Sequence, residues 1–440
     1  MKKQLFAALI AIVFIGSNAL AYYGPNDKSK KPTGKPKANC SPATAKYIME
    51  FNDVRALIEQ GGSMFQNRQN GVAAYEVPKG SNRFAIFAGA LWMGGTDVNG
   101  QLKLAALRYR AGNDFWPGPL SVTPGTGNYN PLFPVGDGAI RDFGEANIDP
   151  DQCIAYDQFY TIRKAEVIRF NIWWECQAGI TTECDDVQAP SNEELNRIYN
   201  WPAHGDVSKG QDYFLAPYYD RDQDGNYNPD NGDHPWYDDI LGRDDIQCGF
   251  DRRISLFGDE THWWVFNDKG NIHTETNGDP IGMEIRAQAF SFATNDEVNK
   301  MTFYNYELIN RGTQTLYDTY FAQYLDADVG NYADDYAGCD VSRGLGYMYN
   351  GDLNDENDGG KLGYGDNPPA IGCDFFEGPY QDADGIDNPG PYFDNATQSL
   401  VVPTVVDALA NNGIVYKGIG IGYSDGIIDN ERFGMRRFTY

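Results

Sequence analysis

The chain has 440 residues, 14% of them aromatic, and a formal net charge of -27. This length allows two or three domains with cores of their own, and the aromatic content excludes a chain that is disordered throughout. Residues 1–37 contain seven Lys and one Asp, so the rest of the chain carries -33. Because phosphate binding needs clustered Lys and Arg, this charge argues against nucleic acid as a partner and favours divalent cations as counter-ions.

The N-terminus has the pattern of an export signal. Lys2 and Lys3 precede an apolar run over residues 5–15, and Ala19-Leu-Ala21 fits a small-x-small cleavage site. We therefore predict a signal peptide over residues 1–21 and a location outside the cell or on its outer surface. The apolar run is shorter than the ~20 residues of a spanning helix, and no later segment predicts a transmembrane segment in the mature chain. Residues 22–38, rich in Lys, Pro and Gly, predict a flexible basic linker.

All seven cysteines follow the predicted cleavage site: Cys40, Cys153, Cys176, Cys184, Cys248, Cys339 and Cys373. Disulfides are permitted outside the cytoplasm, and Cys176 with Cys184 could close a short loop. An odd number leaves at least one thiol, and the spacing does not fix the pairing. The absence of CxxC and HExxH patterns argues against a zinc site.

Residues 39–210 predict a β-rich domain with a helical insertion. Apolar stretches at residues 83–93 and 101–110 flank Asp97-Val-Asn-Gly100, a strong hairpin signal. Three helices are predicted at residues 150–159, at residues 163–175 and from Ser191 onward, where Glu193 and Glu194 occupy the first turn.

Residues 211–425 predict a β-sandwich-like domain with acidic loops. We expect a hairpin over residues 262–276, a strand with a β-bulge over residues 283–294, and a hairpin of residues 301–309 and 315–325 around a turn at 310–314. Consecutive antiparallel strands would form a meander. The predicted fold class is mainly β, with antiparallel sandwich-like sheets, a few short helices and long acidic loops.

The first acidic loop contains Asp220, Asp222, Asp224 and Gly225, which match the D-x-D-x-D-G opening of an EF-hand loop. The twelfth position is Asn231 instead of Glu, and the preceding residues predict an extended segment. Calcium could still be held in a tighter loop, with the shell closed by residues drawn from Asn226, Asp230 and Asp233. The alternative is a solvated acidic turn.

A second acidic region has five carboxylates within fifteen residues and no basic residue among them: Asp326, Asp328, Asp334, Asp335 and Asp340. Such a density predicts either a loop open to water or a bound cation, and we favour calcium. Weaker acidic patterns follow at Asp382, Asp384 and Asp387 and at residues 425–431.

Two stretches of the sequence match catalytic patterns. The G-x-S-x-G match at residues 422–426 is rejected, because Asp425-Gly426 would break the required helix and no His follows His273. Trp236, Trp263 and Trp264 near Asp259, Glu260 and His262 could form a sugar-binding or glycosidase-like cleft. The alternative is that one of the paired indoles lies in the core and the other is partly exposed.

Several stretches together resemble large secreted proteins of Bacteroidota that are cargo of the type IX secretion system and usually carry a C-terminal sorting domain. These stretches are residues 87–110, 200–239, 258–276, 302–312, 326–352 and 429–440. The resemblance implies secretion or surface display, a mainly β architecture and the secretion machinery as a partner. No sorting domain precedes Tyr440, and residues 432–440 resemble a strand. We therefore expect residues 426–440 to begin a further strand or domain of a longer protein.

These observations predict a secreted or cell-surface, non-enzymatic interaction protein, adhesin-like or matrix-like, that is stabilised by structural Ca2+ in acidic loops. Surface glycans or other surface proteins are the expected partners. The alternative is an extracellular glycan-acting enzyme or a carbohydrate-binding module.

Overall fold

The computed structural model describes residues 39–109, 112–121, 146–237, 255–312, 314–380 and 430–440, with short pieces between 385 and 428. The predicted signal peptide and basic linker lie outside the described residues. The elements below belong to one compact unit, Ala38–Tyr440. They are mainly β-strands in antiparallel sheets, as the sequence predicted.

The first sheet combines strands from distant parts of the sequence, in the order β17-β8-β3-β2-β6-β7, with β1 beside β2 and β9 beside β8. Its strands are β1 (Lys46–Met49), β2 (Arg55–Glu59), β3 (Ser63–Met64), β6 (Tyr75–Glu76), β7 (Phe84–Ile86), β8 (Ala88–Thr96), β9 (Leu102–Ala105) and β17 (Tyr317–Asp326). The hairpin predicted around Asp97 is confirmed, since β8 pairs with β9. Along the chain, the domain boundary predicted at residue 210 separates β8 from β17. In the structure these two strands are hydrogen-bonded neighbours in one sheet.

The second sheet has the order β10-β14-β15-β16, with β11 beside β14. Its strands are β10 (Trp116–Pro117), β11 (Tyr160–Arg163), β14 (Glu260–Asn267), β15 (Met283–Ser291) and β16 (Phe303–Asn310). The predicted meander of residues 283–294, 301–309 and 315–325 is confirmed only for the pairing of β15 with β16, because β17 lies in the first sheet; the third strand of the observed meander is β14. The hairpin predicted over residues 262–276 is wrong, because β14 pairs with β15 instead of with residues 272–276. The predicted β-bulge is also wrong, because β15 keeps a continuous register with both of its neighbours.

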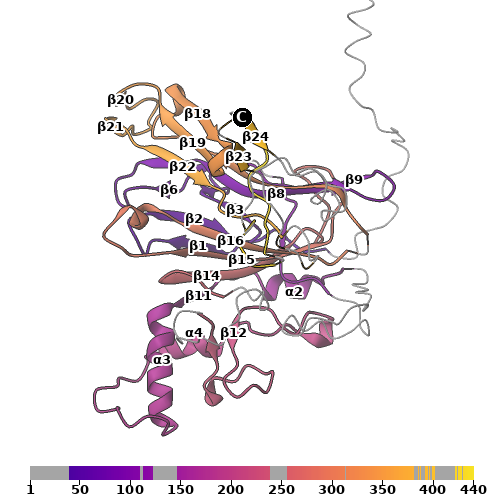
Figure 1. Ribbon diagram of the computed structural model, residues 1–440, viewed down its shortest axis with the longest axis vertical. Helices are drawn as coiled ribbons and strands as arrows, with labels where there is room; N and C mark the ends of the chain where they lie inside the picture. Colours follow the sequence, from indigo (N-terminus) through magenta and orange to yellow (C-terminus); the bar gives the residue numbers. More distant parts are fainter. Residues whose placement is uncertain are drawn as a thin grey trace, which may run out of the picture. The chain divides into compact units, whose positions relative to one another are not determined.

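The two sheets pack face to face as a sandwich (Figure 1). Ile58 and Met64 of the first sheet share one core with Trp264, Phe266 and Ile285 of the second. Along β14 the alternate side chains, Trp263 and Val265, enter a different core. Both faces of this strand are therefore buried, whereas one partly exposed indole was expected.

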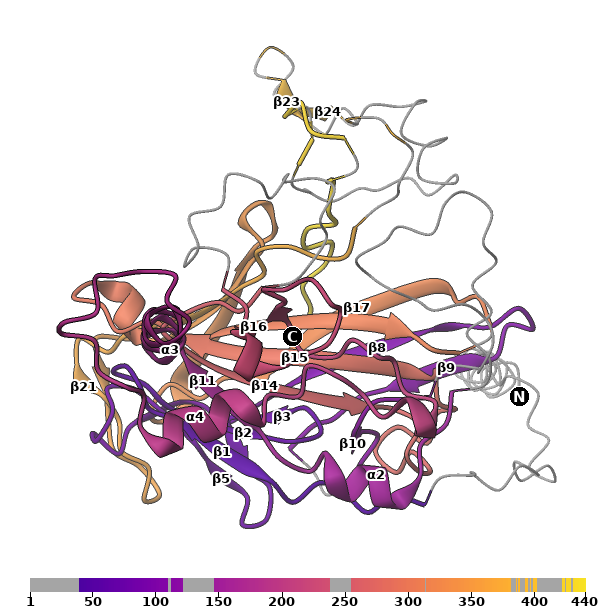
Figure 2. The ribbon, with the colours of Figure 1, turned by 90° about the horizontal axis from the view of Figure 1, so that it is seen from below.

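A helical layer covers the outer face of the second sheet (Figures 1 and 2). Its helices are α2 (Pro150–Ala155), α3 (Lys164–Gln177) and α4 (Asn192–Tyr199). The last begins as predicted, because Ser191 caps it and exchanges hydrogen bonds with Glu194. Phe170 and Ile198 bury their side chains against Trp263. Arg197 of α4 joins the two helices through a bidentate ion pair with Glu166 of α3.

The predicted hairpin of residues 301–325 is wrong, because β16 and β17 belong to different sheets. The connection between them crosses the edge of the sandwich. Arg311 in this connection is fully buried and forms ion pairs with Asp212 at 2.9 Å and Glu284 at 3.2 Å. Burial alone would raise the pKa of Glu284, but Arg311 and Arg286 together lower it. The buried guanidinium holds the segment at the sandwich edge, since breaking a buried ion pair is costly.

A third sheet follows β17 and consists of β18 (Asp335–Asp340), β19 (Leu345–Asn350) and β22 (Ala370–Asp374) in the order β18-β19-β22. It lies on the side away from α3 and α4 (Figure 1). Two-stranded pairs complete the described strands: β4 (Gln66–Asn67) with β5 (Val72–Ala73), β12 (Tyr218–Tyr219) with β13 (His234–Pro235), β20 (Asn354–Asp355) with β21 (Gly365–Asp366), and β23 (Tyr392–Asp394) with β24 (Ser399–Val401).

Short 3-10 helices connect several strands: η1 (Val207–Lys209), η2 (Pro229–Asn231), η4 (Glu297–Lys300), η5 (Tyr332–Asp334) and η6 (Val341–Arg343). The strand expected over residues 432–440 is absent from this described segment. Arg432 forms one isolated bridge with Tyr380, and the residues after it have no regular structure.

Two disulfides join Cys40 to Cys153 and Cys176 to Cys184. The second is the short loop that the spacing suggested. Cys339 and Cys373 are free thiols, and Cys248 lies outside the described residues. Within the described part of the chain, every helix is too short or too polar to cross a membrane.

Candidate functional site

The first acidic loop brings three predicted ligands together. One carboxylate oxygen from each of Asp220, Asp222 and Asp224 lies within 4.8 Å of the others. Among the described residues, no second group of three or more acidic, His or Cys side chains has this spacing. Like charges this close repel one another, so the arrangement is costly without a counter-charge.

The local backbone explains why these carboxylates converge. Gln223 and Gly225 adopt left-handed conformations, with φ of 59° and 82°, and turn the chain tightly between alternate acidic residues. The backbone N–H of Gly225 donates to Asp220 Oδ2 at 2.8 Å, and that of Asn226 donates to Asp224 Oδ1 at 2.7 Å. Asp220 Oδ1 is covered from water and has no hydrogen-bond partner among the described residues. An oxygen in this position is a suitable ligand for a hard cation.

The three other candidate ligands in this loop are already engaged. The Tyr199 hydroxyl donates to Asp230 Oδ1 at 2.5 Å. Asn226 Oδ1 accepts a hydrogen bond from the Tyr213 hydroxyl at 2.5 Å. Asp233 is fully buried, and its two oxygens accept the backbone N–H groups of Arg221 and Asn228, each at 2.8 Å. Burial raises the pKa of Asp233. Asp233 therefore braces the loop, while the first three carboxylates face one another.

Arg221, between two of the acidic residues, anchors the loop to helix α3. Its guanidinium donates to Asn171 Oδ1 at 2.6 Å, pairs with Glu175 at 3.1 Å and lies 4.8 Å from the centre of the Trp174 ring. Asn171 in turn contacts His234 Nε2 at 2.9 Å. The basic residue within the acidic turn thus points away from the three carboxylates and fixes their position against the helical layer.

The second acidic region does not converge in the same way. Asp326 ends β17, whereas Asp335 and Asp340 stand at opposite ends of β18. Burial, together with the charge of Asp326, raises the pKa of Asp328 to about 6. Burial likewise raises the pKa of Asp335 to about 6, although its Oδ2 accepts the backbone N–H of Val329 at 2.8 Å.

Asp334 lies in η5 beside Asp335, and Asp340 forms an ion pair with Arg343 at 3.5 Å. The five predicted ligands are therefore divided between one end of β18 and the other. Asp340 lies a strand away from the other four, and a shared cation site of Asp326, Asp328, Asp334 and Asp335 stays a prediction.

Asp355 is a buried residue of this region whose position the sequence did not reveal. It is 1% exposed, and its carboxylate accepts the backbone N–H groups of Asn331 at 3.1 Å and Tyr364 at 2.6 Å. A Cβ atom on Gly330 would lie 2.1 Å from Asp355 Oδ2. The carboxylate therefore fills the interior of the loop that follows β17. Nothing in its acidic surroundings distinguishes it from the exposed neighbours.

The weaker acidic patterns lie near each other. Asp387 Oδ2 accepts the backbone N–H of Gly426 at 2.7 Å and so links the two predicted loops. Asp425 is engaged within its own loop by the backbone N–H of Ile427 and the amide of Asn430. Asp382 and Asp384 lie outside the described residues.

The aromatic cleft considered as an alternative is closed. Trp236, Trp263 and Trp264 are 6%, 2% and 0% exposed, so none of these indoles offers a face to a sugar. Glu260 is buried beside His262 and bonds Arg163 at 2.7 Å. Burial lowers the pKa of His262. These groups join β11 to β14 inside the molecule.

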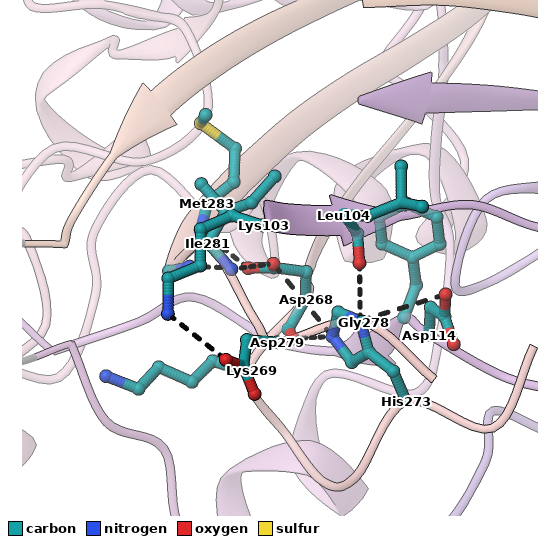
Figure 3. Close-up of polar contacts among 12 residues, drawn as sticks. Lys103, Leu104, Asp114, Asp268, Lys269, His273, Gly278, Asp279, Ile281 and Met283 are labelled. Atoms are coloured by element: carbon teal, nitrogen blue, oxygen red, sulfur yellow. Dashed lines mark hydrogen bonds and ion pairs between the residues drawn. The ribbon is translucent and has the colours of Figure 1, made fainter. Parts of the chain in front are cut away.

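His273 occupies the centre of another buried polar cluster (Figure 3). Its Nδ1 lies 2.8 Å from the carbonyl oxygen of Leu104, and its Nε2 lies 2.6 Å from that of Asp268. The carboxylates of Asp114 and Asp268 lie 3.7 and 4.0 Å from the ring nitrogens. Because all three side chains are fully buried, the cluster holds the β14–β15 connection against β9 instead of offering a site to ligands.

No protein-family model, no curated protein and no solved structure matches this chain. The functional argument therefore rests on the residues themselves. The fold and site define a mainly β protein with a helical layer and an acidic turn at its surface.

Proposed function

We propose that this chain is a secreted or cell-surface interaction protein, adhesin-like or matrix-like, whose turn at Asp220, Asp222 and Asp224 binds structural Ca2+. The observation that carries the calcium proposal is the close approach of the three carboxylates, with Asp220 Oδ1 buried and unpartnered. The donor set consists of oxygen alone, which suits calcium better than zinc. The second acidic region is not part of this proposal, because among the described residues no three of its carboxylates approach one another as closely as those of Asp220, Asp222 and Asp224.

Calcium would act as a staple between the acidic turn and helix α3. The metal binds only the folded arrangement of the three carboxylates, so binding stabilises the folded state by mass action. The anchoring of Arg221 to Asn171 and Glu175 means that ordering the turn also supports the helical layer. An extracellular protein meets enough calcium for such a site, since extracellular modules bind it with dissociation constants of about 0.1–1 mM.

Three observations support export. The N-terminus has a basic start, then an apolar run, and then a small-x-small cleavage site. Two disulfides are suited to an oxidising compartment. The resemblance to type IX secretion cargo points the same way and suggests the secretion machinery as a partner.

Thermal unfolding in calcium and in EDTA tests the metal proposal. At a calcium concentration of about 100 times the dissociation constant, binding adds about 2.7 kcal/mol to the free energy of unfolding. For a chain of this size that shift raises Tm by about 3 °C. Identical melting curves in 10 mM calcium and in EDTA would contradict the proposal.

The role as an interaction protein has a separate test. A glycan-acting enzyme would release reducing sugar from a panel of polysaccharides, whereas we expect no release above that of a heat-inactivated sample. Release that disappears on Glu260→Gln or Asp259→Asn would overturn the non-enzymatic role and leave the calcium proposal untouched.

A further inference from the structure

We propose that the outer face of the β18-β19-β22 sheet is a tyrosine platform that binds a neutral polysaccharide by stacking on its sugar rings. The tyrosine platform consists of Tyr336, Tyr347 and Tyr349. This inference rests on the proposed role as an interaction protein and names the chemistry of the partner.

The register of the sheet places the three rings on one face. Tyr336 of β18 pairs directly with Tyr349 of β19, and Tyr347 follows two residues away on the same side. The ring centres of Tyr336 and Tyr349 are 6.1 Å apart, as are those of Tyr347 and Tyr349, with interplanar angles of 27° and 32°. The rings thus form a nearly continuous row with similar orientations. Their spacing suits a ligand made of repeated flat units.

Glycines make room for the rings to lie against the backbone. A Cβ atom on Gly338, opposite Tyr347, would lie 2.5 Å from Tyr347 Cζ, so this ring lies over the backbone of β18. A Cβ on Gly351 would lie 2.7 Å from Tyr336 Cε2. Gly372 flanks Tyr347 on the other side, in β22. Rings that lie over glycine present their faces to solvent instead of standing edge-on.

The rings are exposed although the sheet is anchored from behind. Tyr336, Tyr347 and Tyr349 are 60%, 38% and 43% exposed. On the opposite face, Ile371 packs against the sandwich core, and Phe438 covers Gly346. Large aromatic side chains that remain exposed on a fixed surface commonly mark an interaction site.

Area and charge decide between possible partners. A whole aromatic side chain has a surface of about 150–250 Å². The exposed fractions of the three tyrosines therefore add up to only about 300 Å² of accessible tyrosine surface. A stable protein interface needs about 800 Å² from each partner, so the tyrosine platform is better matched to a narrow chain ligand. Asp340 and Asp374 follow Gly338 and Gly372 on the same face. Arg343 pairs with Asp340, so the negative charge of Asp374 is the one that disfavours polyanions, and its carboxylate can accept hydrogen bonds from sugar hydroxyl groups.

Affinity electrophoresis of the full chain in gels that contain hydroxyethyl cellulose, galactomannan or dextran tests the proposal. We expect at least one polysaccharide to retard the protein, and Tyr347→Ala and Tyr349→Ala to weaken this binding at least tenfold. Gly338→Val should weaken binding as well, because it lifts the Tyr347 ring while keeping its chemistry. Tyr332→Ala, which removes a tyrosine of similar exposure from η5, should change binding less than twofold.

Retardation by none of the three polysaccharides would overturn the proposal. So would retardation that survives both tyrosine variants, or binding of a Lys-rich peptide at the tyrosine platform in place of any polysaccharide. Each variant is also melted in calcium and in EDTA. An unchanged calcium shift shows that Tyr347→Ala has spared the fold and the metal turn. Polysaccharide binding by a protein without a calcium shift would contradict the metal proposal and support the tyrosine platform.

Discussion

In the turn of Asp220, Asp222 and Asp224, one oxygen from each residue lies within 4.8 Å of the others. In the second acidic region, Asp326 and Asp335 lie at strand ends, and Asp340 lies a full strand away. The two regions have similar compositions, yet the first converges because left-handed residues at Gln223 and Gly225 fold it into a turn. The second contains a β-strand, which extends the chain by about 3.3 Å per residue. The number of carboxylates is therefore a weaker guide to a metal site than the conformation that holds them.

The largest expected effect concerns the second region. Asp355→Ala removes the acceptor of the Asn331 and Tyr364 backbone N–H groups, and each unsatisfied buried donor costs about 1–3 kcal/mol. We expect the free energy of unfolding, measured with urea, to fall by about 4 kcal/mol in calcium and in EDTA alike. Asp358→Ala, at an exposed position nearby, is the control. A loss seen only in calcium would mean that this region binds metal after all.

The next effect concerns the first region. The double variant Asp222→Asn, Asp224→Asn keeps side chains that can accept the local backbone hydrogen bonds but removes two charges. We expect the calcium-dependent gain of about 2.7 kcal/mol to disappear, while stability in EDTA stays equal or rises. Asp185→Asn, Asp186→Asn removes the same charge from an exposed loop and should retain the full gain. If both double variants gained the same stability from calcium, the claim that calcium binds at Asp220, Asp222 and Asp224 would be wrong.

Asn231→Asp supplies the carboxylate that position twelve lacks. Asn231 Nδ2 now donates to Asp222 Oδ2 at 2.7 Å, so the position already faces the turn. In calorimetric titration we expect the variant to bind calcium about tenfold more tightly, a change of about 1.4 kcal/mol. In EDTA its Tm should fall slightly, because a fourth like charge has been added. Gln188→Glu adds the same charge outside the turn. Tighter binding by that control, or weaker binding by Asn231→Asp, would refute the assigned geometry.

The smallest effect is on pH dependence. Burial raises the pKa of Asp328 and of Asp335 to about 6, whereas an Asp in the unfolded chain titrates near 3.9. Between these values the folded protein binds more protons than the unfolded chain, so these residues make stability in EDTA fall as pH rises from about 4 to about 6. Asp328→Asn should flatten this decline relative to wild type in urea melts at pH 4.5 and 7. Parallel pH profiles would show that Asp328 is more solvated than its surroundings indicate.

Local signals in the sequence predicted local structure well. The Asp97–Gly100 hairpin and the Ser191 helix cap both depend on residues within a few positions, and both are confirmed. The convergence of Asp220, Asp222 and Asp224 was also predicted from the sequence, because alternate acidic residues followed by Gly are typical of a tight turn. Asp355 was missed because its role depends on Asn331 and Tyr364, whose backbone groups reach it only in the folded loop.

Long-range packing accounts for the errors. Residues 310–314 have good turn chemistry, but Arg311 is drawn into the interior by Asp212 and Glu284, and the chain crosses to the other sheet. One of the two indoles of Trp263 and Trp264 was expected to be partly exposed, because alternation along β14 assumes one solvated face. The helices α3 and α4 cover that face, and the sequence alone does not say where a helical insertion will pack. The tyrosine platform was likewise hidden, because Tyr336 and Tyr349 become neighbours only through strand pairing.

The central claim is that one cation binds in the turn of Asp220, Asp222 and Asp224. Its most direct test is an anomalous difference map from a crystal grown with terbium, which takes the place of calcium and scatters strongly. We predict a peak among these three carboxylates, within bonding distance of Asp220 Oδ1, that disappears in a second crystal grown with excess EDTA. A map with no peak at this turn, or with its only protein-bound peak beside Asp328 and Asp335, would contradict the account.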